Sequence, residues 1–194
     1  MAALSLCANA RDDRPRGGPG GLRASVTVVR LLYSGEELRQ QMSDMVGSGG
    51  TNADLKALSQ RVLRDDFDAD AVEAGIADRL EAGVSPQHLD RLAAFARTET
   101  GQLVTRIVQT RGAASLPSEV DRHPPHLMHG LGMLFQSDAW KAAFEQIKGD
   151  VVGPMLLGYT KRLVCEGARR DEAELFARMV SSGRCTEGDA AAAQ

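Results

Sequence analysis

One short segment, residues 123–133, gathers side chains that could bind a metal ion, and we call it the His–Met segment. Its candidate ligands are His123, His126 and His129, spaced three apart, with Met128 and Met133. Imidazole nitrogens bind copper, nickel and zinc, and thioether sulfur binds copper(I). If the segment is helical, His126 and His129 share one face and offer two ligands. A metal-handling protein is therefore one prediction, although the pattern favours the alternative of exposed imidazoles at the start of a helix.

The cysteines offer redox chemistry. Cys165 and Cys185 form an even pair near the C-terminal end, whereas Cys7 lies at the other end of the chain. Such a pair is compatible with a disulfide in an oxidising compartment. If residues 171–182 form a straight helix, Cys185 lies about 18 Å beyond the helix start, at about 1.5 Å per residue. Cys165 precedes that start, so a bridge requires the tail to fold back. The spacing favours two unpaired thiols, with the disulfide as the alternative.

Other chemistry finds little support in the sequence. It contains no G-x-S-x-G turn, no H-E-x-x-H pair and no phosphate loop, so we predict no catalytic residue and no cofactor. The 23 basic and 26 acidic residues give a net charge of -3, without the basic surplus of a nucleic-acid-binding protein. No apolar run approaches the roughly 18 residues that span a bilayer. A non-catalytic protein that acts through contacts with an unidentified protein partner is the leading prediction, and an unrecognised enzyme is the least favoured alternative.

One apolar stripe is a candidate contact surface. Trp140, Phe144 and Ile147 follow one another at spacings of four and three, which places them on one face of a helix that Ser137 can cap. A stripe of this kind is more typical of a buried core. A groove that binds an apolar peptide is the alternative that we keep open.

The elements that position these residues are predicted to be helices. Aromatic residues make up only 4% of the chain, and the apolar spacing between Pro19 and Pro86 is helical almost throughout. We predict an all-α bundle of about eight short helices. It forms a single helical domain over residues 24–183, composed of a first part at 24–112 and C-terminal helices at 113–183.

Local signals predict where the helices begin and end. The predicted N-terminal caps are Ser34, Asp70, Ser85, Thr98, Ser137 and Asp171. One helix is predicted from Asp150 to Cys165, and Gly183 is predicted to close the last helix. We interpret residues 112–125 as a loop, and residues 166–174 as a solvated loop that leads into the next helix.

Gly101 stands one turn inside an otherwise amphipathic helix, within the stretch "FARTETGQLVTR". Glycine costs roughly 0.5–1 kcal/mol there relative to alanine. Because Thr98 can cap this helix directly after Phe95 ends the previous one, the two helices must meet at a sharp corner. We predict that their backbones approach too closely there for a Cβ atom.

The stretch "SPQHLDRLAAFARTETGQLV" resembles the signature of the bacterial domain-of-unknown-function family 2059. The matching positions are Ser85, Leu89, Phe95, Thr98, Gly101 and Gln102, whereas Ala96 and Glu99 stand where the family has Tyr and Pro. "VRLLYSGEELRQQM" is similar to the family's opening pair of helices, so the resemblance covers about residues 24–112. It implies an exported, all-helical protein and no particular activity.

The two ends of the chain are predicted to lie outside the helical domain. "MAALSLCANA" ends in the small-x-small form of a signal cleavage site but lacks a basic start. We therefore predict that residues 1–23 are an export signal, intact or clipped, followed by a disordered Gly/Pro/Arg-rich linker, and that 184–194 are a disordered tail. This predicts a periplasmic or secreted protein. If residues 1–10 are not an export signal, the prediction is a cytoplasmic protein.

Overall fold

The computed structural model describes residues 23–48, 53–120 and 122–186, and every regular element among them is a helix. The all-α prediction is confirmed. The predicted number of about eight helices is too low, because the described residues contain eleven α-helices and one short 3-10 helix. The proposed export signal, nearly all of the linker, and residues 187–194 of the predicted tail lie outside the described residues.

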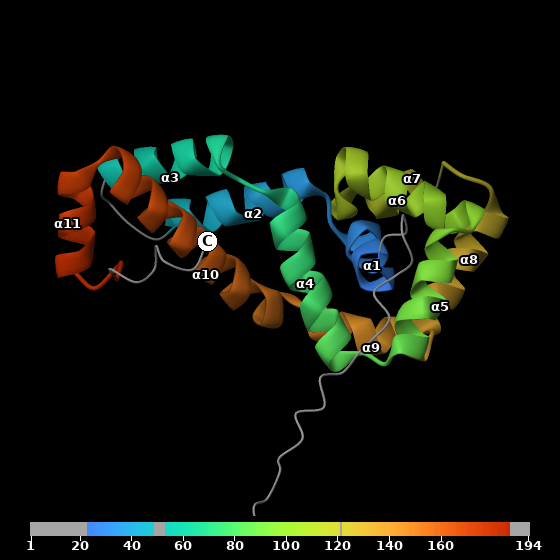
Figure 1. Ribbon diagram of the computed structural model, residues 1–194. Helices are drawn as coiled ribbons and strands as arrows, with labels where there is room; N and C mark the ends of the chain where they lie inside the picture. Colours follow the sequence, from blue (N-terminus) through green and yellow to red (C-terminus); the bar gives the residue numbers. More distant parts are fainter. Residues whose placement is uncertain (1–22, 49–52, 121, 187–194) are drawn as a thin grey trace, which may run out of the picture.

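The elements follow one another with short connections (Figure 1). In chain order they are α1 (Ala24–Leu32), α2 (Gly35–Ser48), α3 (Ala53–Asp65), α4 (Ala69–Gly83), α5 (Pro86–Ala96), α6 (Glu99–Arg111), η1 (Ala113–Ser115), α7 (Leu116–Val120), α8 (Pro125–Gln136), α9 (Asp138–Ile147), α10 (Gly149–Asp171) and α11 (Ala173–Ser181).

Four of the predicted N-terminal caps are confirmed. In each, the hydroxyl oxygen accepts a hydrogen bond from the backbone N–H three residues later, which satisfies one of the free donors at a helix start. The donor–acceptor distances are 3.0 Å for Ser34, 3.3 Å for Ser85, 3.1 Å for Thr98 and 3.1 Å for Ser137.

Other predicted boundaries are wrong. α4 begins earlier than expected, because the Asp68 carboxylate accepts the Ala71 N–H at 3.1 Å and Asp70 already lies in the first turn. Residues 112–125, interpreted as a loop, contain η1, α7 and the first residue of α8. α10 continues well beyond Cys165, and no side chain caps the start of α11.

A close helix crossing explains why α10 continues. Its Gly167 is buried, and a Cβ atom at this position would collide with Cγ2 of the buried Val62 in α3. Tertiary packing along this crossing therefore outweighs the weak helix propensity of glycine. Within the segment that we interpreted as a solvated loop, Gly167 and Ala168 are therefore buried, whereas the following residues 169–171 are exposed.

Two groups of buried side chains hold the helices together. The larger surrounds α1, whose Val28 and Val29 are fully buried against α4, α5 and α6. The smaller joins α3, α10 and α11 and includes Val62, Ala168 and Met179. The 23-residue α10 contributes to both groups and runs from one to the other (Figure 1).

The predicted corner at Gly101 is confirmed. A Cβ atom there would lie 2.6 Å from Ala96 Cα and 2.7 Å from the Phe95 carbonyl carbon, both at the end of α5. Thr98 fixes the corner from two sides, since its hydroxyl accepts the Gly101 N–H and donates to the Phe95 carbonyl at 2.7 Å. Glycine is therefore required by the close approach of two backbones.

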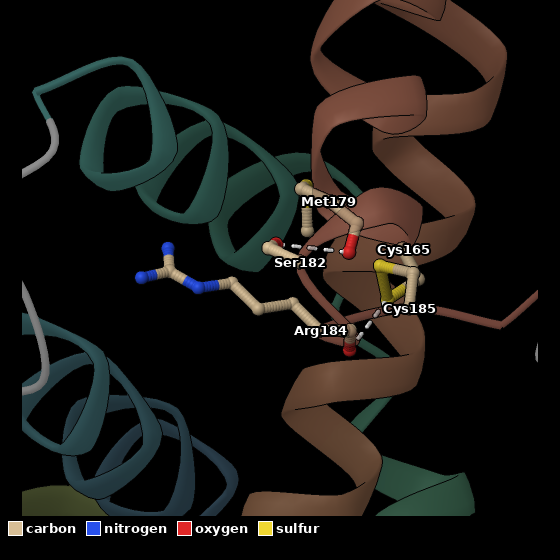
Figure 2. Close-up of a disulfide and its surroundings, with 5 residues drawn as sticks. All are labelled: Cys165, Met179, Ser182, Arg184 and Cys185. Carbon is tan, nitrogen blue, oxygen red and sulfur yellow. Dashed lines mark hydrogen bonds between the residues drawn. A yellow bond between two sulfur atoms is a disulfide. The ribbon is translucent and has the colours of Figure 1, made fainter.

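The prediction of two unpaired thiols is wrong, because Cys165 and Cys185 form a disulfide (Figure 2). The chain reverses after α10, so that α11 packs against it, and it turns again at Gly183, whose φ is +70°. The Arg184 and Cys185 amides then donate to the Met179 carbonyl at 2.9 and 3.2 Å. These reversals bring the two cysteine Cα atoms to 5.8 Å, whereas our estimate assumed a straight path away from Cys165.

In the described part of the chain, no helix has the combination of length and apolar character that crossing a bilayer requires.

Candidate functional site

The side chains of the His–Met segment differ in their exposure. His123 precedes α8 and is half buried, whereas His126 and His129 lie exposed on the first turns of α8. Met128 is half buried and Met133 is exposed. Among the described residues, no group of three or more His, Cys, Asp or Glu side chains is positioned to hold a metal ion. His123, His126 and His129 thus belong to no such group.

The aromatic side chains of the same region do converge. α8 and α9 are separated by Ser137 alone. Its hydroxyl donates to the Leu134 carbonyl at 2.7 Å and accepts a hydrogen bond from the backbone N–H of Trp140 at 3.1 Å. This corner brings the last turn of α8 against the first turn of α9. The Phe135 and Trp140 ring centroids lie 4.9 Å apart with an interplanar angle of 56°. Phe144 follows one turn later, with its centroid 6.4 Å from that of Trp140.

These rings line a groove of about 340 Å³, which we call the aromatic groove. Its wall consists of Tyr33, Phe135, Trp140 and Phe144, and its floor includes Leu31, Val104, Leu131, Leu134 and Ile147. The floor residues come from α1, α6, α8 and α9 and are all buried. Phe135 and Phe144 are instead 44% and 49% exposed, although large aromatic side chains are normally buried in the core.

Hydrogen bonds hold Tyr33 in the wall of the groove. Its hydroxyl donates to the Ile147 carbonyl at 2.9 Å, which satisfies a free acceptor at the end of α9. Gln109 of α6 donates to the Tyr33 carbonyl at 2.7 Å. Burial raises the pKa of the Tyr33 hydroxyl, and the nearby Glu37 carboxylate adds to the increase. Tyr33 therefore stays neutral and fixed in place near neutral pH.

Lys148 is the one charged residue among the described residues that line the groove. Its ammonium group forms an ion pair with Glu145 at 2.8 Å and lies 4.0 Å from Asp150. The hydrogen bond to Glu145, followed by the charge of Asp150, raises the Lys148 pKa. Because its charge is compensated by its own neighbours, the groove offers an electrically neutral, apolar surface.

The chemistry of this lining suits binding better than acid–base catalysis. The described lining residues include no carboxylate, histidine or cysteine, and the Tyr33 hydroxyl already donates within the fold. Pockets of a few hundred Å³ that are lined by aromatic and aliphatic side chains bind apolar groups. Phe135, Trp140 and Phe144 offer such a group large, rigid contact surfaces.

The sequence predicted part of this site. The stripe of Trp140, Phe144 and Ile147 lines the groove, as the peptide-groove alternative requires. Phe135 was missed, although the Ser137 cap between two apolar segments is a local signal that places it beside Trp140. The contribution of Tyr33, more than one hundred residues away in sequence, has no such signal because only the tertiary fold brings it there.

The chain was also compared with known proteins. No protein-family model, no curated protein and no solved structure matches it, so the resemblance to the bacterial domain-of-unknown-function family 2059 stays a prediction.

Proposed function

We propose that this chain is a non-catalytic, exported protein of the bacterial cell envelope that binds an apolar segment of a partner protein in the aromatic groove. The observation that carries the proposal is the exposure of Phe135 and Phe144 on either side of Trp140, in a groove without an uncompensated charge. Aromatic residues are enriched at protein interfaces, where they contribute most of the binding free energy.

The neutral lining defines the chemistry of the partner segment. A charged side chain that entered the groove would lose its hydration without gaining a counter-ion, at a cost of several kcal/mol. Aliphatic and aromatic side chains instead gain about 25 cal/mol for each Å² of apolar surface that they bury. A partner helix that inserts apolar side chains at intervals of three and four residues fits a groove between helices.

The Cys165–Cys185 disulfide supports the proposed location. Disulfides persist in oxidising compartments such as the bacterial periplasm and are rare in the cytosol. The test is to isolate the protein from cell fractions in the presence of an alkylating agent and to measure its intact mass. We expect it in the envelope fraction, shortened at its N-terminus, with both cysteines protected from alkylation. Recovery from the cytosol with Met1 present and both thiols alkylated would overturn this part of the proposal.

The binding proposal can be tested with peptides. A phage library of random dodecapeptides is selected on the wild-type protein and counter-selected on the double variant Phe135→Ser/Phe144→Ser. Both side chains are partly exposed, so we expect the variant to fold. Met133→Ser is a matched control, because Met133 also lies on α8 and is 59% exposed but does not line the groove.

Trp140 provides the readout, since it is the only tryptophan of the chain. We expect the selected peptides to be apolar, to shift the Trp140 emission to shorter wavelengths, and to bind the double variant at least about tenfold more weakly than the wild type. The Met133→Ser control should bind like the wild type. Equal binding to the wild type and the double variant, or selection of highly charged peptides, would overturn the proposal.

A further inference from the structure

A second groove, of about 390 Å³, lies between α2, α3, α10 and α11, beside the disulfide. Its apolar surface includes Leu157, which is 55% exposed, and the buried Val164 and Met179. Three cationic residues line it as well: Lys56 of α3, Lys161 of α10 and Arg184 of the turn after α11. We call it the cationic groove. It shares no lining residue with the aromatic groove.

The cations of this groove differ from Lys148 in one respect. Lys56, Lys161 and Arg184 are all exposed, and none of them forms an ion pair with another described residue. Other basic residues nearby do have partners: Arg61 pairs with Glu172 at 2.8 Å, and Arg178 with Asp54 at 3.6 Å. The three charges are therefore available to an anion from outside the fold.

The remaining polar groups of the lining are occupied. Ser59 and Thr160 are almost fully buried, and their hydroxyls donate to carbonyls of their own helices, Leu55 at 2.7 Å and Leu156 at 2.8 Å. Neither hydroxyl has a donor left for a ligand. The described lining residues thus combine an apolar floor with cationic charge, and they include no free neutral side-chain donor that would select a sugar or an amide.

The disulfide positions one of the cations. Cys185 is buried and bonded to Cys165 of α10, so the backbone of the preceding Arg184 is held beside the groove. The Arg184 amide is also tied to the Met179 carbonyl at 2.9 Å. Figure 2 shows the Arg184 side chain extending away from the disulfide, toward the neighbouring helices.

From this combination we propose that the cationic groove binds a single-chain anionic amphiphile, a fatty-acid carboxylate. The alkyl chain would lie over Leu157, Val164 and Met179, where it gains free energy from burial. The carboxylate would face Lys56, Lys161 and Arg184, where charge-assisted hydrogen bonds are stronger than neutral ones. This ligand matches both halves of the groove, whereas a small inorganic anion leaves the apolar half unused.

The test measures binding of radiolabelled dodecanoate to the full chain by equilibrium dialysis, below the micellar concentration of the ligand. Dodecyltrimethylammonium, which has a chain of the same length and the opposite charge, is the ligand control. The protein variants are Lys56→Gln, Lys161→Gln, Arg184→Gln and their combination. Lys141→Gln is the matched control, because Lys141 is exposed on α9 and lines neither groove.

We expect each single variant to weaken dodecanoate binding about threefold to fivefold, as for one exposed ion pair, and the triple variant to weaken it more than tenfold. Leu157→Ser should also weaken binding, and Lys141→Gln should not change it. Trp140 emission should stay constant, because Trp140 does not line this groove. Absence of dodecanoate binding, equal binding of the cationic surfactant, or an unchanged affinity of the triple variant would overturn the proposal. A binding site that Phe135→Ser/Phe144→Ser removes would overturn it too.

Discussion

Replacement of Gly101 by alanine tests the packing of the α5–α6 corner. Alanine has the higher helix propensity, so without tertiary contacts the substitution would stabilise α6 by roughly 0.5–1 kcal/mol. In the fold, however, the new methyl group would lie 2.6 Å from Ala96 Cα and 2.7 Å from the Phe95 carbonyl carbon. Both are backbone atoms, which cannot rotate away, so α6 must move relative to α5.

The expected loss in the free energy of unfolding follows from the contact and the helix cap that this movement disturbs. Overpacking of a tight contact costs typically about 1–3 kcal/mol. Displacement of α6 also weakens the cap in which Thr98 accepts the Gly101 N–H at 3.1 Å, and a cap contributes about 1 kcal/mol. After subtraction of the propensity gain, we expect the free energy of unfolding to fall by about 2 kcal/mol. For a protein of this size, that corresponds to a decrease in Tm of about 4–8 °C.

The assay is urea unfolding followed by far-ultraviolet circular dichroism, together with a thermal scan. Gly158→Ala is the matched control, because Gly158 lies exposed within α10 and a Cβ atom there meets no atom within 4 Å. It has the same effect on the unfolded chain and should stabilise the protein by about 0.4–1 kcal/mol. If Gly101→Ala is as stable as the wild type, or more stable, the backbones at this corner are not in close contact and the reasoning is wrong.

Three further predictions concern the disulfide, Tyr33 and the His–Met segment. The Cys165–Cys185 bridge closes a loop with a sequence separation of 20 residues, so its reduction should lower the free energy of unfolding, measured with urea, by about 3 kcal/mol. The stability of the variant with both cysteines replaced by alanine should not change when the reductant is added. Because the pKa of Tyr33 is raised in the fold, its contribution to stability is complete below the unfolded pKa of about 10 and is lost as the pH rises through the folded pKa. Tyr33→Phe should therefore flatten the loss of stability above that pH, and it should cost about 1 kcal/mol at pH 7 because the hydrogen bond to Ile147 is absent. An excess of zinc should leave Tm unchanged, since the described residues contain no group of three His, Cys, Asp or Glu side chains that could hold a metal ion. A zinc-dependent rise in Tm that is lost when His126 and His129 are replaced by alanine would contradict this prediction.

Local signals account for the part of the fold that could be predicted from the sequence. The side chain of a cap such as Ser85 or Thr98 accepts a hydrogen bond from a backbone amide three residues later, so the residues that form the cap lie within one helical turn of the sequence. Gly101 was interpretable for the same reason, since Phe95 in the last turn of α5 lies only six residues earlier.

Long-range contacts account for the errors. The continuation of α10 through Gly167 depends on Val62, which lies more than one hundred residues earlier in the chain. The disulfide depends on two chain reversals, and our estimate followed α11 as a straight rod that leads away from Cys165. Helix propensity did not predict the continuation of α10, and linear distance did not predict the disulfide, because tertiary packing decides both.

Both proposed grooves lie where the chain changes direction between helices. At Ser137, one residue ends α8 and begins α9, so apolar side chains from two helix ends are turned toward each other and remain exposed. At Gly183, the chain reverses after α11, and the disulfide fixes Arg184 beside α10. Side chains within regular helix–helix contacts are used for packing, as the buried Val28 and Val29 of α1 show. The corners at Ser137 and Gly183 therefore leave apolar and charged groups available that regular helix–helix contacts would bury, and the cationic groove adds Leu157 and Lys161 from within α10.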